Sequence, residues 1–362
     1  MSKQVIIRML HFFLFVSFSF AGGSQGITLP RVPSPAAMVS QTIGISTITV
    51  NYSRPSVKSR KVWGGLVPYG WNKQGFGTGN EAPWRAGANE NTTISISHDA
   101  NVAGKPVPAG VYGLFFVVNK DNSGEVILSK DSRSWGSYFY DSKQDILRSG
   151  ISIREGPHTE MLSYDFSNIT KNSADLVLKW EKKQLLVKIL FDVDKIVLAN
   201  AAEELKGPTG FNWQGFSSAA NYALQNKINL DQALTWINNA VAQNNGFPTL
   251  IIKSGILKEL NKSEEAEKVM NEAIAVGTET ELNAYGYQLM NDGEQEKAIQ
   301  LLTINTKRFP KSANTWDSLG EAYFIMGDKK NAAIFFKKAL GLNPSDNVKI
   351  NSEKYLRQMG EL

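Results

Sequence analysis

The sequence predicts two domains, an all-β antiparallel sandwich followed by an all-α solenoid of helix pairs. In the first half, apolar residues alternate over short segments, which is typical of strands with one buried face. In the second half the apolar spacing becomes helical, and alanines recur at intervals close to the length of one helix pair. These alanines stand at positions 233, 266, 298 and 332. The 362 residues suffice for two domains of ordinary size.

Residues 1–23 have the layout of a secretory signal peptide. Lys3 and Arg8 give a basic start, an apolar run follows from Met9 through Phe20, and small residues surround Ala21. A membrane-spanning helix needs roughly 18–20 apolar residues, and this run is shorter. We therefore expect a cleaved signal, an exported protein that is periplasmic or secreted, and no transmembrane span in the mature chain.

The composition limits the chemistry that we expect. The signal takes two basic residues with it, so the formal net charge falls from +5 to +3 on cleavage. A charge this small, without a basic block, is not typical of a nucleic-acid-binding protein. The chain has no cysteine, and only His98 and His158 remain after cleavage. A zinc site without cysteine needs three histidine or carboxylate ligands, so we expect no metal and no cofactor.

Residues 27–194 are predicted to form the β-sandwich. The segment 45–52 alternates, with Ile48, Val50 and Tyr52 on one face, and the polar run 121–124 predicts a hairpin turn. Further strands are expected at 150–154, 160–166, 174–180 and 184–191. Residues 57–91 break the pattern, since they hold three tryptophans and seven glycines without a clean period. A long irregular stretch inside a compact domain is often a functional loop.

Residues 195–207 are predicted to be a linker helix, which Gly207 and Pro208 end, and residues 208–362 to be helical repeats. The last repeat, 313–346, has large residues that fill the space between two helices and small ones where the helices approach. They are Trp316, Leu319, Gly320, Tyr323, Ala332, Phe336, Ala339 and Pro344. This pattern resembles the tetratricopeptide repeat, which implies a module for protein–protein interaction. Residues 279–312 keep much of the pattern, the two pairs before them are degenerate, and 346–359 is expected to cap the solenoid.

The first half also resembles a known family. The segments that carry the resemblance are Tyr52–Pro55, Trp63–Gly64, Trp84–Thr92, Pro108–Tyr112 and Trp135–Gly136. They are similar to the domain of unknown function 2911 family, over about residues 30–190. This resemblance implies an exported bacterial protein, sometimes with tetratricopeptide repeats following. It implies no activity and no site residues.

The segment Trp84–Glu90 is the strongest candidate for a ligand site in the β-domain. It brings together an indole, a guanidinium, an amide and a carboxylate, and an arginine can hold a carboxylate or phosphate through two hydrogen bonds. The candidate ligand-binding residues are Arg54, Arg60, Trp63, Trp84, Arg85, Asn89 and Glu90. The alternative is structural, with Arg85 and Glu90 pairing to fix the long loop. No catalytic residue is identified.

The repeats predict a partner groove lined by the first helix of each of the last two pairs. Its candidate residues are Thr280, Asn283, Tyr287, Met290, Asn314, Asp317, Glu321 and Phe324. By the pattern of the resembled family, repeats that clamp a terminal carboxylate carry lysine and arginine at such positions, and this sequence has none there. A neutral or basic peptide is therefore the expected partner.

Two hypotheses for the function follow. In the first, the protein is a non-enzymatic, exported adaptor that binds a protein or peptide through the repeats. In the second, the Trp84–Glu90 loop makes the β-domain a carbohydrate- or anion-binding module or a hydrolase. The residues favour the first, because no second catalytic group is recognisable beside Arg85. If the candidate residues converge on one open polar cleft, the second gains support.

Overall fold

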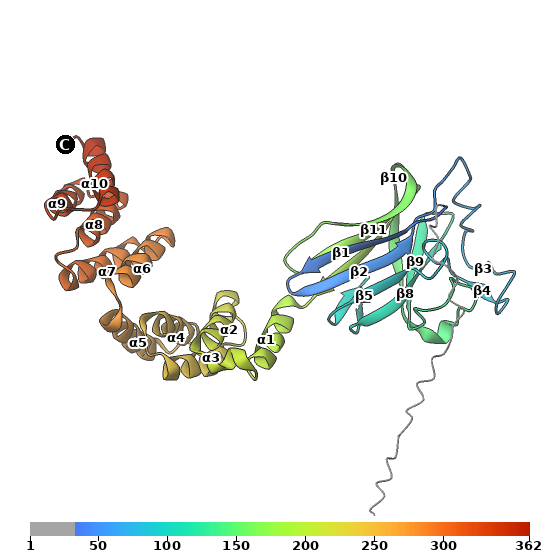
Figure 1. The fold of residues 1–362 in the computed structure, drawn as a ribbon, viewed down its shortest axis with the longest axis horizontal. Helices are drawn as coiled ribbons and strands as arrows, with labels where there is room; N and C mark the ends of the chain where they lie inside the picture. The colour runs from blue at the N-terminus through green and yellow to red at the C-terminus, as the bar shows by residue number, and fades with distance from the viewer. Residues whose placement is uncertain (1–32) are drawn as a thin grey trace, which may run out of the picture. The chain divides into compact units, whose positions relative to one another are not determined.

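The computed structural model describes residues 33–362. The chain divides into two compact units, and the boundary along the chain falls between Leu190 and Phe191 (Figure 1). We call the described residues up to Leu190 the β-unit and the residues from Phe191 the helical unit. The predicted signal peptide, residues 1–23, lies outside the described residues, as do residues 27–32 of the predicted sandwich.

Within the described residues, nine strands of the β-unit form one antiparallel sheet. In the order in which they are hydrogen-bonded, they are β1 (Ala36–Ile43), β2 (Ser46–Ser53), β5 (Thr93–Ile96), β8 (Gly110–Val118), β9 (Ser123–Ser129), β10 (Asp145–Ser167), β11 (Ser173–Phe191), β6 (Ala100–Val102) and β7 (Lys105–Val107). Two short strands, β3 (Asn72–Lys73) and β4 (Glu81–Ala82), form a separate pair. A short 3-10 helix, Ser142–Gln144, precedes β10.

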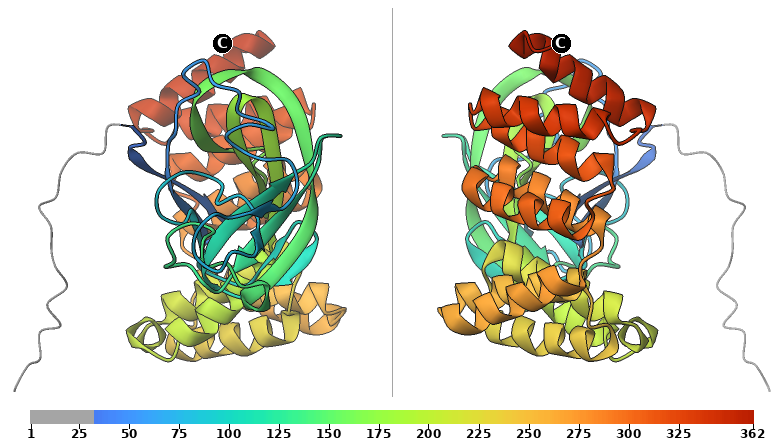
Figure 2. Two further views of the ribbon diagram at one scale, coloured as in Figure 1. Left: turned by 90° about the vertical axis from the view of Figure 1, so that its right-hand side faces the viewer. Right: turned by 90° about the vertical axis from the view of Figure 1, so that its left-hand side faces the viewer.

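The sheet folds over on itself through β10, which Figure 2 shows as a long curved strand. The first part of β10 pairs with β9 and its last part with β11, with register shifts between Glu155 and Ser163. The chain that leaves β2 meets the far part of β10, where Ser56 and Met161 form a bridge. The beginning of the sheet is thereby brought against β10, and the predicted antiparallel sandwich is confirmed.

The alternation that predicted β2 places its apolar face inside, since Ile48 and Val50 are fully buried. Two expected strand boundaries are wrong. Segments 150–154 and 160–166 are parts of the single strand β10, and 174–180 and 184–191 are parts of β11. Residues 181–183, which separate the two expected strands, instead continue β11 through an irregularity, where Glu181 has a positive φ of 51°. A polar sequence can mark an irregularity in a long strand as well as a turn between two strands.

Strand β8 is buried on both faces, because the irregular segment at residues 57–91 packs against one of them. Leu114 and Phe116 lie on one face of the strand. Phe115 and Val117 on the other face belong to a second apolar cluster with Ile127 of β9. The remaining members of that cluster, Ala82 and Tyr140 with Trp71 packed against them, come from the loops at 57–91 and 130–144. Burial of this apolar surface therefore holds the loops against the sheet.

The helical unit is a stack of antiparallel helix pairs in the part of the chain described (Figure 2). Its helices are α1 (Val193–Glu204), α2 (Trp213–Asn226), α3 (Leu230–Gln243), α4 (Phe247–Glu259), α5 (Ser263–Val276), α6 (Glu279–Asn291), α7 (Gln295–Arg308), α8 (Ala313–Ile325), α9 (Lys329–Leu340) and α10 (Asp346–Met359). A 3-10 turn at Pro208–Phe211 follows α1. Among the described residues, no helix is long and apolar enough to cross a membrane.

The last helix pair packs as its sequence pattern predicts. The Phe335 ring stacks on Trp316 at 5.9 Å and on Tyr323 at 5.3 Å between ring centres. Gly320 of α8 lies so close to α9 that an added Cβ would be 2.9 Å from the Phe336 ring. Phe336 is fully buried. Helix α10 covers this end of the stack, as a solenoid terminus requires.

Candidate functional site

Trp84 is the centre of the candidate site in the β-unit. Its backbone N–H and C=O both pair with Phe116 of β8, each at 2.9 Å. Its ring stacks on Trp180 of β11, with ring centres 5.9 Å apart and planes 16° apart. The Trp63 ring lies edge-on to both, at 5.8 and 6.1 Å. Trp63 and Trp180 are buried, whereas Trp84 is only half-buried and remains accessible.

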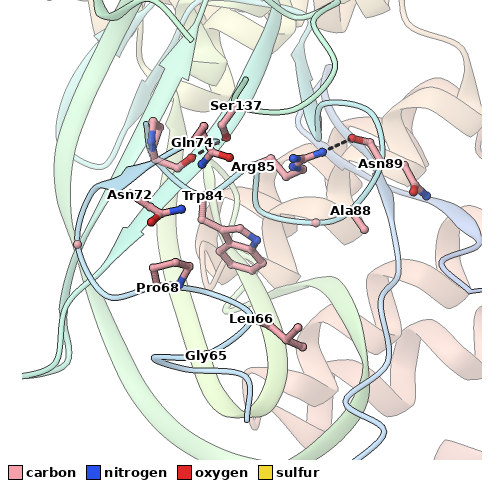
Figure 3. Close-up of a pocket in the computed structure, with 13 residues that line it drawn as sticks. Gly65, Leu66, Pro68, Asn72, Gln74, Trp84, Arg85, Ala88, Asn89 and Ser137 are labelled. Atoms are coloured by element: carbon pink, nitrogen blue, oxygen red, sulfur yellow. Dashed lines mark hydrogen bonds between the residues drawn. The ribbon is translucent and has the colours of Figure 1, made fainter. Parts of the chain in front are cut away.

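A cleft of about 510 Å³ opens beside Trp84, and we call it the Trp84 cleft. Figure 3 shows the Trp84 ring between the Arg85–Asn89 segment and the loop that carries Leu66 and Pro68. Polar side chains come from Asn72, Gln74, Arg85, Asn89 and Ser137. The Asn72 and Gln74 amides make no hydrogen bond to any described residue, so both are free to bind a ligand.

A second hollow of about 410 Å³ adjoins this cleft, and we call it the Arg60 hollow. The two share four lining residues, which are Leu66, Trp84, Gly87 and Ala88. Lys58, Arg60 and Trp180 line only the Arg60 hollow. Trp84 therefore forms a wall common to both spaces.

Arg85 both lines the cleft and fixes the loop. Its Nη1 donates to the backbone oxygen of Asn89 at 2.7 Å, and its guanidinium lies 5.0 Å from the centre of the Tyr138 ring. The backbone of Gly136 lies against the same group, so closely that a Cβ there would collide with it. The Asn89 amide donates to Ser34 at 3.2 Å. These contacts fix a turn in which Asn89 has a positive φ of 61°.

The lining of the two spaces is cationic. Lys58, Arg60 and Arg85 contribute three positive side chains, and no carboxylate of the described residues belongs to either lining. Arg60 is oriented by bonds from its Nε to Val57 and from its Nη2 to Ser56, both backbone oxygens. Glu160, outside the lining, accepts a hydrogen bond from the Lys58 backbone, which lowers the pKa of its carboxyl; His158 and Arg60 lower it further.

The structure brings four of the seven predicted ligand residues to these two spaces: Arg60, Trp84, Arg85 and Asn89. Trp63 lies behind Trp84. Arg54 lines neither space, since its Nε donates to the Leu162 oxygen at 2.9 Å. Glu90 lines a separate hollow of about 410 Å³ beside β1 and β2.

Sequence reasoning missed other lining residues, which are Asn72, Gln74, Ser137 and Trp180. They come from three separate segments, and no local pattern links them. Lys58 belongs to the run of cations at 54–61, which is the signal that could have identified it. Among the described residues, no group of histidine, aspartate or glutamate side chains could hold a metal ion.

In the helical unit, α10 occupies part of the predicted groove. Glu321 accepts hydrogen bonds from the Tyr287 and Tyr355 hydroxyls, both at 2.9 Å. Burial, together with this carboxylate, raises the pKa of Tyr355 to about 12. Asp317 accepts from Asn351 and Ser352 of α10, and burial raises the pKa of its carboxyl above the ordinary value.

The other groove candidates differ in their exposure. Phe324 packs on the Tyr355 ring at 4.7 Å, and Met290 is buried. Asn314 donates to Glu279 at 3.4 Å, and Thr280 is exposed. Asn283 is half-buried, and its Oδ1 is a buried acceptor without a donor among the described residues.

Comparison with known proteins confirms both resemblances. Residues 34–189 match the model of a family described as a protein of unknown function, DUF2911. Residues 313–346 match the tetratricopeptide repeat. No curated protein matches the chain.

Several solved structures are similar to the chain. The Pseudomonas aeruginosa protein pilF is 19% identical, over 43% of this chain and 72% of that chain, with a TM-score of 0.27. MamA is 19% identical, over 40% of this chain and 86% of that chain, with a TM-score of 0.27. YrrB, described as a TPR protein with an unusual peptide-binding site, is 16% identical, over 44% of this chain and 84% of that chain, with a TM-score of 0.27.

Proposed function

We propose, from a β-unit that matches DUF2911 and a helical unit that ends in a tetratricopeptide repeat, that the protein is an exported adaptor. Its helical unit binds a protein or peptide of the compartment to which the chain is exported. The observation that carries the proposal is the repeat at 313–346, whose helices pack closely around Gly320 and Phe336. Repeats of this kind stack into extended binding surfaces, which supports interaction over catalysis.

The partner would bind at the first helices of the central pairs, α4 and α6. At the end of the stack, α10 already takes up the hydrogen-bonding capacity of Asp317 and Glu321. On α6, Thr280 is exposed and Asn283 holds a buried oxygen without a donor among the described residues.

Export is part of the proposal and rests on the order of basic, apolar and small residues in positions 1–23. Intact-mass measurement of the protein recovered from its own host tests it. The mature chain should lack its first 21 to 23 residues, and a chain that still begins at Met1 would contradict export by this route.

Partner binding is tested with the full mature chain and two arginine variants. Thr280→Arg places a bulky charge on the proposed surface of α6, and Gln300→Arg places the same group on an exposed position of α7. After incubation with envelope extract of the host, the wild type and Gln300→Arg should retain the same protein, and Thr280→Arg should lose it. The proposal fails if nothing is retained, or if Thr280→Arg retains the protein as well as the control does.

A further inference from the structure

We propose that the Trp84 cleft and the Arg60 hollow together bind an acidic saccharide, a short oligosaccharide that carries carboxylates. This inference goes beyond the adaptor function, because it concerns only the β-unit. Three features of the described residues support it: a fixed aromatic wall, amides without partners, and cations in a lining that contains no carboxylate.

The aromatic wall is rigid and accessible. Trp84 is held at its backbone by β8 and at its ring by Trp180 and Trp63. The ring still lines both spaces, so a ligand would contact it without rearranging the loop. An indole offers a flat apolar surface on which the C–H face of a sugar ring can pack. The volumes of the two spaces fall within the range of small-molecule binding sites.

Polar groups beside this wall have no partners within the described chain. The Asn72 and Gln74 amides line the cleft, and each can donate and accept hydrogen bonds from sugar hydroxyls. Trp180 also lines the Arg60 hollow, where its ring supports the Trp84 wall from behind.

The charges select an acidic ligand. Arg85 lies in the Trp84 cleft, and Lys58 and Arg60 lie in the Arg60 hollow, so cations stand on both sides of the aromatic wall. Arg60 is already oriented by two backbone oxygens, and its Nη1 has no hydrogen-bond partner among residues 33–362. A guanidinium held in this way loses little side-chain freedom when it binds a carboxylate. A saccharide with successive carboxylates fits cations that are separated by a sugar-binding wall.

The same lining favours binding over cleavage. Glycoside hydrolysis ordinarily needs two carboxyl groups that flank the bond to be broken. In the part of the chain that the structure describes, neither the Trp84 cleft nor the Arg60 hollow has a carboxylate in its lining. The proposal is therefore a binding site that retains its saccharide unchanged.

Titration calorimetry on the full mature chain tests the proposal. The probes are tetrasaccharides of galacturonic, glucuronic and mannuronic acid, each with its methyl-esterified form, which keeps the sugar rings and removes the charge. At least one acid form should bind, and its ester should bind about tenfold more weakly, the loss expected for one charge-assisted hydrogen bond. The proposal is overturned if no acid form binds, or if acid and ester bind equally.

Variants assign the binding to this site. Arg60→Gln and Asn72→Ala should each weaken binding about three- to tenfold. Lys61→Gln removes a neighbouring exposed charge that lines neither space, and it should leave the affinity within about twofold of the wild type. Equal losses in Lys61→Gln and Arg60→Gln would overturn the site, because they would indicate attraction to the surface in general. Unchanged binding in both Arg60→Gln and Asn72→Ala would also overturn it. A thermal melt of each variant confirms that the β-unit remains folded.

Discussion

Replacement of Gly320 by leucine tests the packing of the terminal repeat. Gly320 lies on α8 at its closest approach to α9, and an ideal Cβ there would be 2.9 Å from Cδ1 of Phe336. Carbon atoms in ordinary contact are about 3.5–4 Å apart. The Phe336 ring is fully buried and stacks on Tyr355 at 5.2 Å, so it cannot move aside without disturbing α10.

The size of the effect follows from two opposing contributions. Overpacking of a closely packed core costs about 1–3 kcal/mol, and four added carbon atoms place this substitution near the upper end. Leucine favours a helix over glycine by somewhat under 1 kcal/mol, which offsets part of the cost. We therefore expect the free energy of unfolding of the helical unit to fall by about 2 kcal/mol. For a unit of this size, that loss lowers the Tm by roughly 4–8 °C.

The assay is a thermal melt of the full chain, followed by far-UV circular dichroism in the helix band. Gly341→Leu serves as the matched control, since an added Cβ at Gly341 meets only backbone oxygens, the nearest at 3.5 Å. The control should change the helical transition little, and Gly320→Leu should lower it. Equal shifts in the two variants would refute the close approach of α8 and α9.

Two further predictions concern single side chains. Because burial raises the pKa of Asp317, the folded state should keep a proton that the unfolded state has already lost, at pH values just above the ordinary pKa of about 4. The stability of the helical unit should therefore fall as the pH rises through this window, and thermal melts in a buffer series should lose that slope in Asp317→Asn. Arg85→Ala removes the hydrogen bond to Asn89 and the packing against Gly136, and it should lower the free energy of unfolding of the β-unit by about 1–2 kcal/mol in chemical denaturation. An unchanged midpoint for Arg85→Ala would show that Arg85 does not fix the loop.

The fold was predictable because each half repeats one local rule. Alternation identifies the buried face of β2, and the spacing of Gly320 and Ala332 identifies a helix pair without any knowledge of its neighbours. Strand continuity was less predictable. Gly156 and Pro157 interrupt the alternation in β10, yet the strand passes through them with a register shift. The partner strand decides whether such a segment is an irregularity or a turn, and pairing is not a local property of the sequence.

The candidate site was predictable only where its residues are contiguous. Trp84, Arg85 and Asn89 lie in one short segment, and all three line the Trp84 cleft. Asn72 and Ser137 reach the same cleft from other loops, which converge because β8 and β9 bury apolar side chains from both. That convergence depends on packing between segments that are distant in the sequence, and no short motif predicts it.

The two candidate binding surfaces differ in how much hydrogen-bonding capacity they leave unused. At the end of the solenoid, Glu321 and Asp317 accept hydrogen bonds from α6 and α10, so a ligand there would have to displace internal contacts. In the Trp84 cleft, the Asn72 and Gln74 amides have no partner among the described residues, so a ligand would add hydrogen bonds at little internal cost. The sequence identifies candidate residues on both surfaces, such as Glu321 and Arg85, but it does not show which hydrogen bonds they make. The hydrogen-bond partners of each side chain distinguish the two surfaces. The acidic residues at the groove positions bind α10 and so hold the solenoid cap, whereas the amides of the irregular loop have no internal partner and can bind a ligand.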